Sequence, residues 1–547
     1  MKTKKAMKKI THIGMAALVA MGIMGAACSK IESLEIETPE TQKENIVTLT
    51  TTVCFAADGT KALTGAGVKT FAVGETMAIY YWKNKGDNHE KAVSAPLTAG
   101  DITNGGKSAT FTFTLDNPYK DMSVSYVYPA AMANADFTPN YDALYNNQDG
   151  TLATLASNFD FCTKSGAWSG ENLPPLTLEN QLAILAITLK DEAGTSDITS
   201  GTTKLTVSDG TNTYNVTPSA AAGPIYVAIR PTSDATIDIT ATSGGKGYYK
   251  TLATKTYEAG NGYPVSWKMT QGANLSKLTA AYTAQNGDKL TGTLGSNVKI
   301  SIADGATVTL KDANINGSGT WTSGNYAGIT CAGDATITLE GTNTVKGFAN
   351  GYPGIFVSSG KTLVINGTGE LNASSNGSYG TGSGGAGLGG GNKMDCGNIE
   401  IQSGTVTATG NKHGAGIGGG QNANCGNITI SGGTVTATGG YRAAGIGGGR
   451  RGNSGTQRGY DSGSCGNITI SGGTVTATGE DGAAGIGGGR GYNNSYKSSC
   501  GTITITSGVT SVTATKGGTD APNSIGAGYS GTCGSVTIEA GANVTQN

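Results

Sequence analysis

The chain has 547 residues, of which 89 are glycine, a much larger share than the usual figure of about 7%. Its 37 basic and 38 acidic side chains leave a formal net charge of −1, which excludes the broad basic surface that nucleic-acid binding requires. Charged residues make up only 14% of the chain, too few for disorder driven by charge excess. The composition therefore predicts several folded units rich in β structure, and nucleic acid is not an expected partner.

Residues 1–27 have the pattern of a secretion signal. Several lysines precede an apolar stretch that runs from Ile10 to Ala27, and small residues lead directly to Cys28. This arrangement resembles the bacterial lipobox, in which the signal is cleaved before the cysteine and the thiol is acylated, for example with palmitate. We therefore expect lipidation of Cys28, an acidic tether over residues 28–45, and a surface position anchored in the outer membrane.

Residues 46–272 show the two-residue period of half-buried strands. In Ser108–Leu115 and Thr236–Thr242, apolar residues alternate with polar ones. No long segment shows the helical period, and two prolines follow Leu173. We therefore predict two β-sandwich subdomains, residues 46–172 and residues 173–272.

Four segments of this half carry a family resemblance, and they are Phe71–Tyr80, Tyr126–Pro129, Leu176–Leu185 and Tyr257–Trp267. They resemble the fimbrillin-like lipoproteins of Bacteroides-type bacteria. The resemblance implies a pilus-related or surface role, with fimbrial subunits as partners that add a strand to an exposed sheet edge. Family members that polymerise are first cleaved by an Arg-specific protease. The first arginine of this chain is Arg230, so activation by that cleavage is not expected.

Residues 280–547 contain an internal repeat with two signatures. One is Cys-Gly-Asn-Ile-Thr-Ile or a close variant, and its copies begin at Cys396, Cys425, Cys465, Cys500 and Cys533. The other is Ala-Gly-Ile-Gly-Gly-Gly, which begins at Ala415, Ala444 and Ala484. Three short strands per repeat without a helix predict a parallel, right-handed β-helix of about seven or eight coils. The predicted fold class is therefore all-β.

Equivalent residues of successive coils should stack into ladders. The two clearest inward ladders are Ile417, Ile446 and Ile486, and Val406, Val435 and Val475. The repeat cysteines are expected to stack as small buried thiols because parallel Cβ vectors are poorly aimed for bonding, with disulfides as the alternative. Cys54 and Cys162 both lie in the sandwich half, and whether they pair stays open.

The repeat region offers no recognisable catalytic set. Acidic residues are few from Cys396 onward and none recurs at a fixed strand position, whereas glycoside hydrolysis needs two carboxylates facing each other. Polysaccharide lyase chemistry would need a Lys or Arg base beside calcium held by clustered acids. His89 and His413 are the only histidines after the signal. We expect no enzyme, with a polysaccharide lyase as the weaker alternative.

Tyrosine and arginine concentrate in the loops between repeats. The candidate ligand-binding residues are Tyr441, Arg442, Arg450, Arg451, Tyr460, Arg490, Tyr492 and Tyr496. Aromatic faces and guanidinium groups suit sugar rings and carboxylated glycans, although solvated loop tips show the same composition. The repeats also resemble carbohydrate-binding β-helix domains of bacterial surface adhesins. That resemblance implies polysaccharide or host-glycan ligands and calcium, but the sequence contains no clear calcium-ligand set, so no cofactor is predicted.

Together these features predict a non-enzymatic, lipid-anchored surface adhesin or fimbria-associated protein whose β-helix contacts glycans. A second hypothesis is a structural pilus-associated protein whose β-helix is a spacer without glycan binding.

Overall fold

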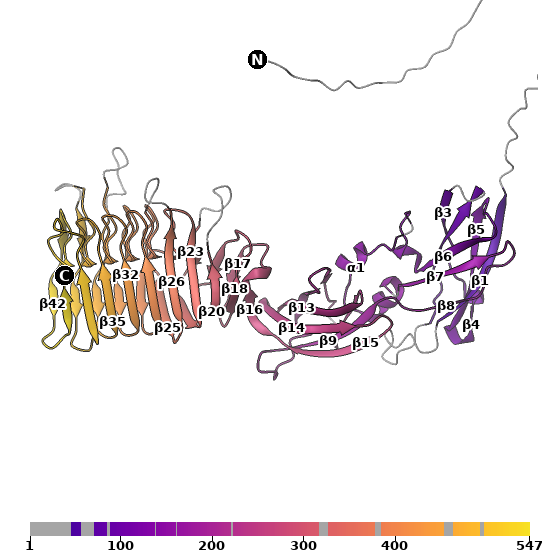
Figure 1. The fold of residues 1–547 in the computed structure, drawn as a ribbon. Coiled ribbons are helices and arrows are strands. Elements are labelled where there is room, and N and C mark those ends of the chain that lie inside the picture. The colour runs from indigo at the N-terminus through magenta and orange to yellow at the C-terminus, as the bar shows by residue number, and fades with distance from the viewer. Residues whose placement is uncertain are drawn as a thin grey trace, which may run out of the picture. The chain divides into compact units, whose positions relative to one another are not determined.

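The computed structural model describes residues 45–55, 70–84, 88–136, 138–159, 161–219, 223–316, 326–377, 384–452, 463–492 and 497–547. The predicted secretion signal, Cys28 and most of the predicted tether lie outside these residues, as do Tyr460 and Tyr496. The fold is all-β and includes a parallel β-helix, as the sequence predicts (Figure 1). Within the described ranges, no helix combines the length and the apolar character needed to cross a bilayer.

The first β-sandwich consists of two sheets with strand orders β4-β5-β1-β8 and β3-β2-β6-β7. The strands are β1 (Ile46–Phe55), β2 (Ala78–Lys83), β3 (Asn88–Val93), β4 (Ile102–Thr103), β5 (Ser108–Asp116), β6 (Met122–Tyr128), β7 (Cys162–Trp168) and β8 (Leu176–Leu178). Strand β5 shows the expected alternation: Phe111, Phe113 and Leu115 are buried, and the threonines between them are not. Side chains from both sheets meet in one core.

The second β-sandwich has one sheet of order β12-β9-β15 and another that contains β10, β11, β13 and β14. Its strands are β9 (Ala183–Lys190), β10 (Thr202–Ser208), β11 (Thr213–Val216), β12 (Ile225–Ile229), β13 (Thr232–Ser243), β14 (Lys246–Tyr257) and β15 (Gly262–Lys268). Its core also takes in side chains from short helical segments that precede β7 in the chain. These segments are η4 (Ala130–Met132), α1 (Asp142–Asn146) and η5 (Leu155–Phe159); α2 (Leu152–Thr154) precedes η5 and buries no side chain.

The buried side chain of Gln148 joins that earlier segment to strand β12 of the second sandwich. Its amide donates to the carbonyl of Ala228 at 2.8 Å and accepts from the Ala228 N–H at 2.8 Å. The core of the second sandwich therefore contains residues from both sides of position 172, the boundary between the two sandwiches that the sequence predicts.

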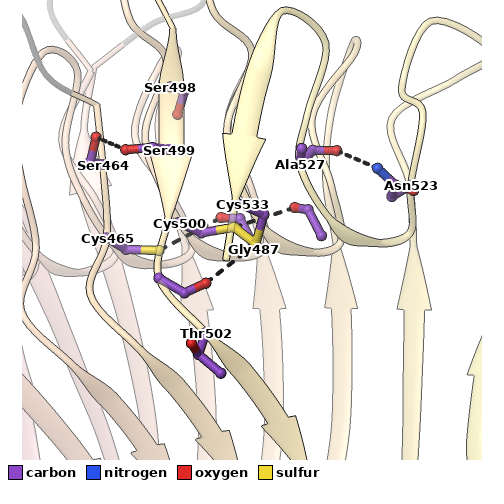
Figure 2. Close-up of a disulfide and its surroundings, with 12 residues drawn as sticks. Ser464, Cys465, Gly487, Ser498, Ser499, Cys500, Thr502, Asn523, Ala527 and Cys533 are labelled. Carbon is purple, nitrogen blue, oxygen red and sulfur yellow. Dashed lines mark hydrogen bonds between the residues drawn. A yellow bond between two sulfur atoms is a disulfide. The ribbon is translucent and has the colours of Figure 1, made fainter. Parts of the chain in front are cut away.

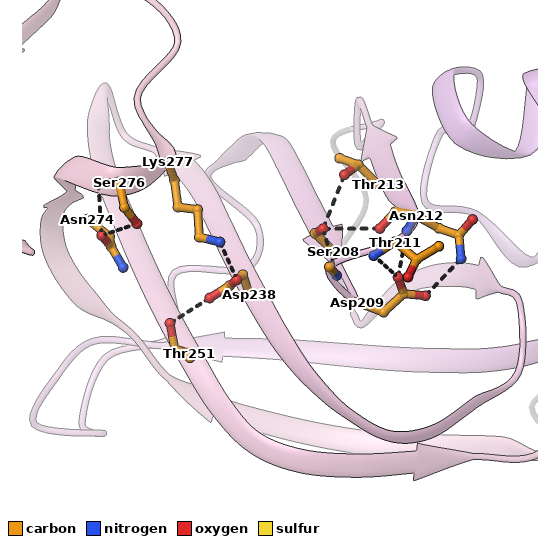
Figure 3. Close-up of polar contacts among 11 residues, drawn as sticks. Ser208, Asp209, Thr211, Asn212, Thr213, Asp238, Thr251, Asn274, Ser276 and Lys277 are labelled. Atoms are coloured by element: carbon orange, nitrogen blue, oxygen red, sulfur yellow. Dashed lines mark hydrogen bonds and ion pairs between the residues drawn. The ribbon is translucent and has the colours of Figure 1, made fainter. Parts of the chain in front are cut away.

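A hydrogen-bonded sheet continues from the second sandwich into the β-helix. Strand β16 (Thr270–Asn274) pairs antiparallel with β14 and parallel with β18 (Lys289–Thr293). The short helix η6 (Leu275–Lys277) follows β16, and Lys277 forms a 2.6 Å ion pair with Asp238 of β13, which also accepts a hydrogen bond from Thr251 (Figure 3). Figure 3 also shows Asp209 closing the β10–β11 turn by accepting three bonds from Thr211 and Asn212.

The β-helix is built from three columns of parallel strands, one strand per coil in each column. The first column contains β18, β20 (Ala306–Ile315), β22 (Ala335–Glu340), β25 (Thr362–Gly367), β28 (Asn398–Ile401), β31 (Ile428–Ile430), β34 (Ile468–Ile470), β38 (Ile503–Ile505) and β42 (Val536–Ile538). The second contains the end of β20, then β23 (Thr342–Asn350), β26 (Glu370–Asn376), β29 (Thr405–Thr409), β32 (Thr434–Thr438), β35 (Thr474–Thr478), β39 (Ser511–Thr515) and β43 (Val544–Gln546).

The third column contains β17 (Tyr282–Ala284), β19 (Ile300–Ile302), β21 (Ile329–Cys331), β24 (Ile355–Val357), β27 (Leu388–Gly389), β30 (Ile417–Gly418), β33 (Ile446–Gly447), β36 (Ile486–Gly487) and β40 (Ile525–Gly526). Its described part is a 9-stranded sheet, against the seven or eight coils expected. The difference arises at the start, because β17 and β19 precede the earliest repeat that the sequence reveals.

The predicted ladders are confirmed. Ile446 pairs in register with Ile417 and Ile486, and Val435 pairs with Val406 and Val475. Each of these side chains is at most 1% exposed, so the ladders form the core of the β-helix.

In the later coils of the third column, a glycine follows the inward isoleucine and allows neighbouring coils to approach closely; the pairs are Ile417–Gly418, Ile446–Gly447, Ile486–Gly487 and Ile525–Gly526. Gly447 has φ of +130°, and a Cβ at this position would overlap the carbonyl oxygen of Gly487 in the next coil. The glycine-rich signature is therefore required both by backbone conformation and by space.

The cysteine expectation was wrong in part. Cys396 is bonded to Cys425 and Cys500 to Cys533, each with a Cα–Cα distance of 4.5 Å, while Cys465 between them keeps a buried thiol. Coils stack closely enough for a disulfide to join directly opposed cysteines, despite their parallel Cβ vectors. In the sandwich half, Cys54 and Cys162 are not bonded to each other.

We predict that Gly447→Ala destabilises the β-helix much more than Gly526→Ala. The two glycines have nearly the same φ, +130° and +131°, but a Cβ at Gly526 would come no closer than 3.5 Å to its nearest neighbour, Asn523. The backbone cost of a side chain is therefore similar at both positions, and only Gly447→Ala adds overlap between coils, which should cost about 2–3 kcal/mol more. Urea unfolding of both variants measures the difference; equal destabilisation would contradict the proposed close contact.

Candidate functional site

Two loops of each coil meet along one rim of the β-helix. One loop follows the Thr-Val-Thr-Ala-Thr strand, and the other follows the Gly-Gly-Gly run. Backbone bonds tie the second loop to the first loop of the preceding coil: Arg450 N–H donates to His413 at 2.9 Å, Arg490 to Arg442 at 3.0 Å and Tyr529 to Gly482 at 2.7 Å. This regular bonding brings together side chains that are far apart in sequence.

Arginines and carboxylates alternate along this rim. Arg442 Nε lies 2.8 Å from one oxygen of Asp481, and Arg490 lies 3.3 Å from the other oxygen and 3.2 Å from Asp520. Burial of Asp481 opposes its ionisation, but hydrogen bonds from Arg442 and Tyr441 and the nearby positive charges lower its pKa overall. Asp481 is therefore ionised at neutral pH and holds both guanidinium groups in place.

Two of the guanidinium groups also stack on aromatic rings. Arg442 lies 4.6 Å from the centroid of the Tyr441 ring, and Arg490 lies 4.5 Å from that of Tyr529. Tyr529 is 42% exposed, so its ring is accessible. Sequence reasoning missed Tyr529 because its repeat is degenerate, although it occupies the position that Arg450 and Arg490 hold in earlier coils.

Arg450 differs from its neighbours because its guanidinium group contacts a histidine. Its NH1 lies 2.9 Å from Nε2 of His413, whose Nδ1 lies 2.8 Å from the backbone oxygen of Tyr441. Nδ1 must donate to that carbonyl and Nε2 must accept from the guanidinium, so His413 is neutral. Burial, followed by the charge of Arg442, lowers the pKa of Arg450. Among the described residues, no carboxylate forms an ion pair with Arg450.

The remaining predicted residues do not join this cluster in the same way. Arg451 NH1 donates to the backbone oxygen of Lys497 at 2.9 Å. Tyr492 is 48% exposed. Tyr460 and Tyr496 lie outside the described residues. We name the assembled group the arginine rim, defined as Tyr441, Arg442, Arg450, Arg490 and Tyr529.

The calcium that the family resemblance implies does not fit the residues present. A hollow of about 420 Å³ is lined by Glu480, Asp481, Asp520 and Lys516, but both oxygens of Asp481 are engaged by arginines and a lysine lines the same space. In the part of the chain that is described, no three His, Cys, Asp or Glu side chains are grouped as metal ligands.

A family model described as a beta helix repeat matches residues 399–421, 428–450 and 468–490. These segments include the ladders and every residue of the arginine rim except Tyr529, and the match agrees with the stacking described above. The C-terminal region is thus a β-helix repeat region.

Solved structures show weaker similarity. A candidate cell adhesion protein from Bacteroides fragilis is 9% identical, with 41% of this chain and 97% of that chain covered and a TM-score of 0.26. A fimbrial assembly protein from Parabacteroides distasonis is 13% identical, with 41% and 91% covered and a TM-score of 0.24. No curated protein matches the chain. TM-scores at this level do not establish a shared fold, so the function proposed below is argued from this chain's own residues.

The neutral His413 predicts a pH-dependent stability. Burial lowers its pKa to about 4, with the charge of Arg450 acting in the same direction. In the unfolded chain the histidine pKa is near 6.5, so as pH falls the unfolded chain is protonated before the folded one. The contribution of neutral His413 to the free energy of unfolding is therefore complete above about pH 6.5, and about 3 kcal/mol of stability is lost as pH falls toward 4.

His413→Gln keeps a donor and an acceptor but cannot titrate in this range. Thermal unfolding measured between pH 7 and pH 4 should therefore show a smaller loss of stability for this variant than for the wild type. Identical pH profiles would show that His413 is not held neutral by its surroundings.

Proposed function

We propose that this chain is a surface-exposed, non-enzymatic adhesin or fimbria-associated protein whose arginine rim contacts glycans. The observation that carries the proposal is the pre-arranged pair of stacked arginines, Arg442 and Arg490, held by Asp481 beside the half-buried Arg450. Side chains that are already fixed lose little conformational entropy on binding, which favours affinity.

The rim's chemistry favours a carboxylated sugar. Tyr529 is 42% exposed, so the part of its ring that Arg490 does not cover is available to contact a pyranose ring. Arg442 and Arg490 are paired with carboxylates, whereas Arg450 donates to the neutral His413 and carries a charge that no described carboxylate balances. A uronate carboxylate beside Arg450 would provide that balance through a charge-assisted hydrogen bond.

Sequence features support the cellular context of this proposal. The lipobox-like segment ending at Cys28 supports a lipid anchor in the outer membrane, and the fimbrillin-like motifs support fimbrial partners that bind by strand addition. Absence of catalysis is part of the proposal. We predict that incubation with pectic substrates releases no unsaturated uronate, and its release would favour a polysaccharide lyase instead.

A second candidate function is that of a spacer. The hydrogen-bonded sheet that runs from β14 through β16 and β18 into the β-helix favours a mechanical role, because it joins the second sandwich to the repeats without a flexible linker. In this case the rim residues would stabilise the loops and bind no glycan.

The deciding experiment is a binding titration of the full chain on immobilised polygalacturonate and on neutral glycans. We predict that Arg450→Gln weakens binding to the uronate polymer by about 10-fold to 100-fold, as expected for loss of one charge-assisted hydrogen bond. The matched control is Lys361→Gln, which removes one positive charge from the β-helix at an ion pair with Asp304 and should bind like the wild type. Equal losses in both variants would indicate nonspecific attraction, and no binding by any form would favour the spacer.

A further inference from the structure

Five cysteines occupy the same position in successive coils and form a continuous ladder. They are Cys396, Cys425, Cys465, Cys500 and Cys533. The outer members are joined in pairs, and the central Cys465 is the thiol left between two disulfides. Figure 2 shows its sulfur beside the Cys500–Cys533 bond.

The backbone hydrogen bonding between neighbouring coils is the same at all four steps of the ladder. The glycine after each later cysteine donates to the carbonyl of the cysteine one coil before, at 3.0 Å in the bonded Cys396–Cys425 step and at 3.0 Å in the bonded Cys500–Cys533 step. The same bond measures 3.0 Å from Gly466 to Cys425 and 3.1 Å from Gly501 to Cys465, where no disulfide is formed. Cys465 also forms parallel β-bridges with Cys425 and with Cys500.

This equivalence has a chemical consequence. Parallel partners lie about 4.8 Å apart at their Cα atoms, inside the range that a disulfide spans. The backbone therefore places Cys465 as favourably for a disulfide with Cys425 or Cys500 as it places those two cysteines for their present disulfides.

We propose that the ladder is a site of internal thiol–disulfide exchange, in which the free thiol can move from Cys465 to either end of the ladder. In one direction the Cys465 thiolate attacks the sulfur of Cys500. The Cys465–Cys500 bond forms, the Cys500–Cys533 bond breaks, and its electron pair leaves with Cys533, which takes up the proton that Cys465 lost. Attack on Cys425 releases Cys396 in the same way. Neither step consumes an oxidant or a reductant.

The exchange changes how accessible the free thiol is to solvent and to thiol reagents. Cys465 is 6% exposed, and burial raises the pKa of its thiol to about 12, so it is protected where it stands. Cys533 lies in the last described coil and is only partly buried. Movement of the thiol to Cys533 thus creates a modification site for low-molecular-weight disulfides and other thiol reagents.

The test uses the full chain, oxidised in a glutathione buffer, and maps thiols by maleimide labelling and tryptic peptides. Cleavage separates all five cysteines, because a basic residue lies between each neighbouring pair: Lys412, Arg442, Arg490 and Lys516. In Cys533→Ala we expect Cys465 and Cys500 to be linked to each other, leaving no thiol in the ladder. Recovery of Cys465 and Cys500 as two separately labelled thiols would overturn the proposal.

A time course on the native wild type provides an independent measurement. Label should accumulate at Cys533, because Cys396 and Cys465 are only 3% and 6% exposed, although rapid unfolding without reduction should find the thiol mainly at Cys465. The control Cys465→Ala keeps both disulfides but has no nucleophile, so its Cys533 should stay unlabelled. Equal labelling of Cys533 in this control, or wild-type label confined to Cys465, would contradict exchange.

Discussion

In-register stacking of parallel coils is the constraint on which the rest of the β-helix depends. Each coil offers unpaired backbone groups that only another coil can satisfy, so stability comes from contacts between neighbours. Close approach explains the recurrent glycines of the third column: at Gly389, Gly418, Gly447 and Gly487 any side chain would occupy space held by the next coil's carbonyl group. The same approach places cysteines of neighbouring coils within bonding distance.

Stacking also brings like charges together, and side chains of the rim loops reduce the resulting repulsion. Because each loop position repeats from coil to coil, basic residues at one position, such as Arg450 and Arg490, are brought close to one another. Asp481 and Asp520 offset part of this charge, and His413 accepts a hydrogen bond from Arg450 as a neutral base. The result is a rim of fixed guanidinium groups in which the charge of Arg450 is not balanced by a described carboxylate. The arginine rim is therefore a candidate binding site for an anionic ligand.

Much of the β-helix could be predicted from the sequence, because period-two alternation and recurrent glycines specify stacking directly. The pairing of Ile417, Ile446 and Ile486 follows from the repeat alone. The disulfides were not predicted: stacking places the cysteines within bonding distance, but the repeat pattern does not specify whether their side chains are oriented to bond, nor which of the five pair. Likewise the second sandwich core includes Met132 and Phe159, which no local pattern assigns to it.

The candidate site was predicted in part. Tyr441, Arg442, Arg450 and Arg490 do converge, because equal loop positions stack. His413 was noticed only as a rare residue, and its role depends on the backbone carbonyl of Tyr441 in the next coil. Tyr529 was missed because its glycine signature is altered, although alignment of the loops by position would have found it.

The most direct test of in-register stacking is a crosslinking measurement between exposed positions of neighbouring coils. Thr436 and Thr476 are direct partners on β32 and β35. Their Cα atoms should lie about 4.8 Å apart, whereas Thr436 and Thr474 are diagonal neighbours at about 8 Å. The account predicts that the double variant Thr436→Cys with Thr476→Cys forms a disulfide that peptide mapping detects, and that Thr436→Cys with Thr474→Cys does not. Preferential bonding of the diagonal pair would show that the coils are out of register and would contradict the account.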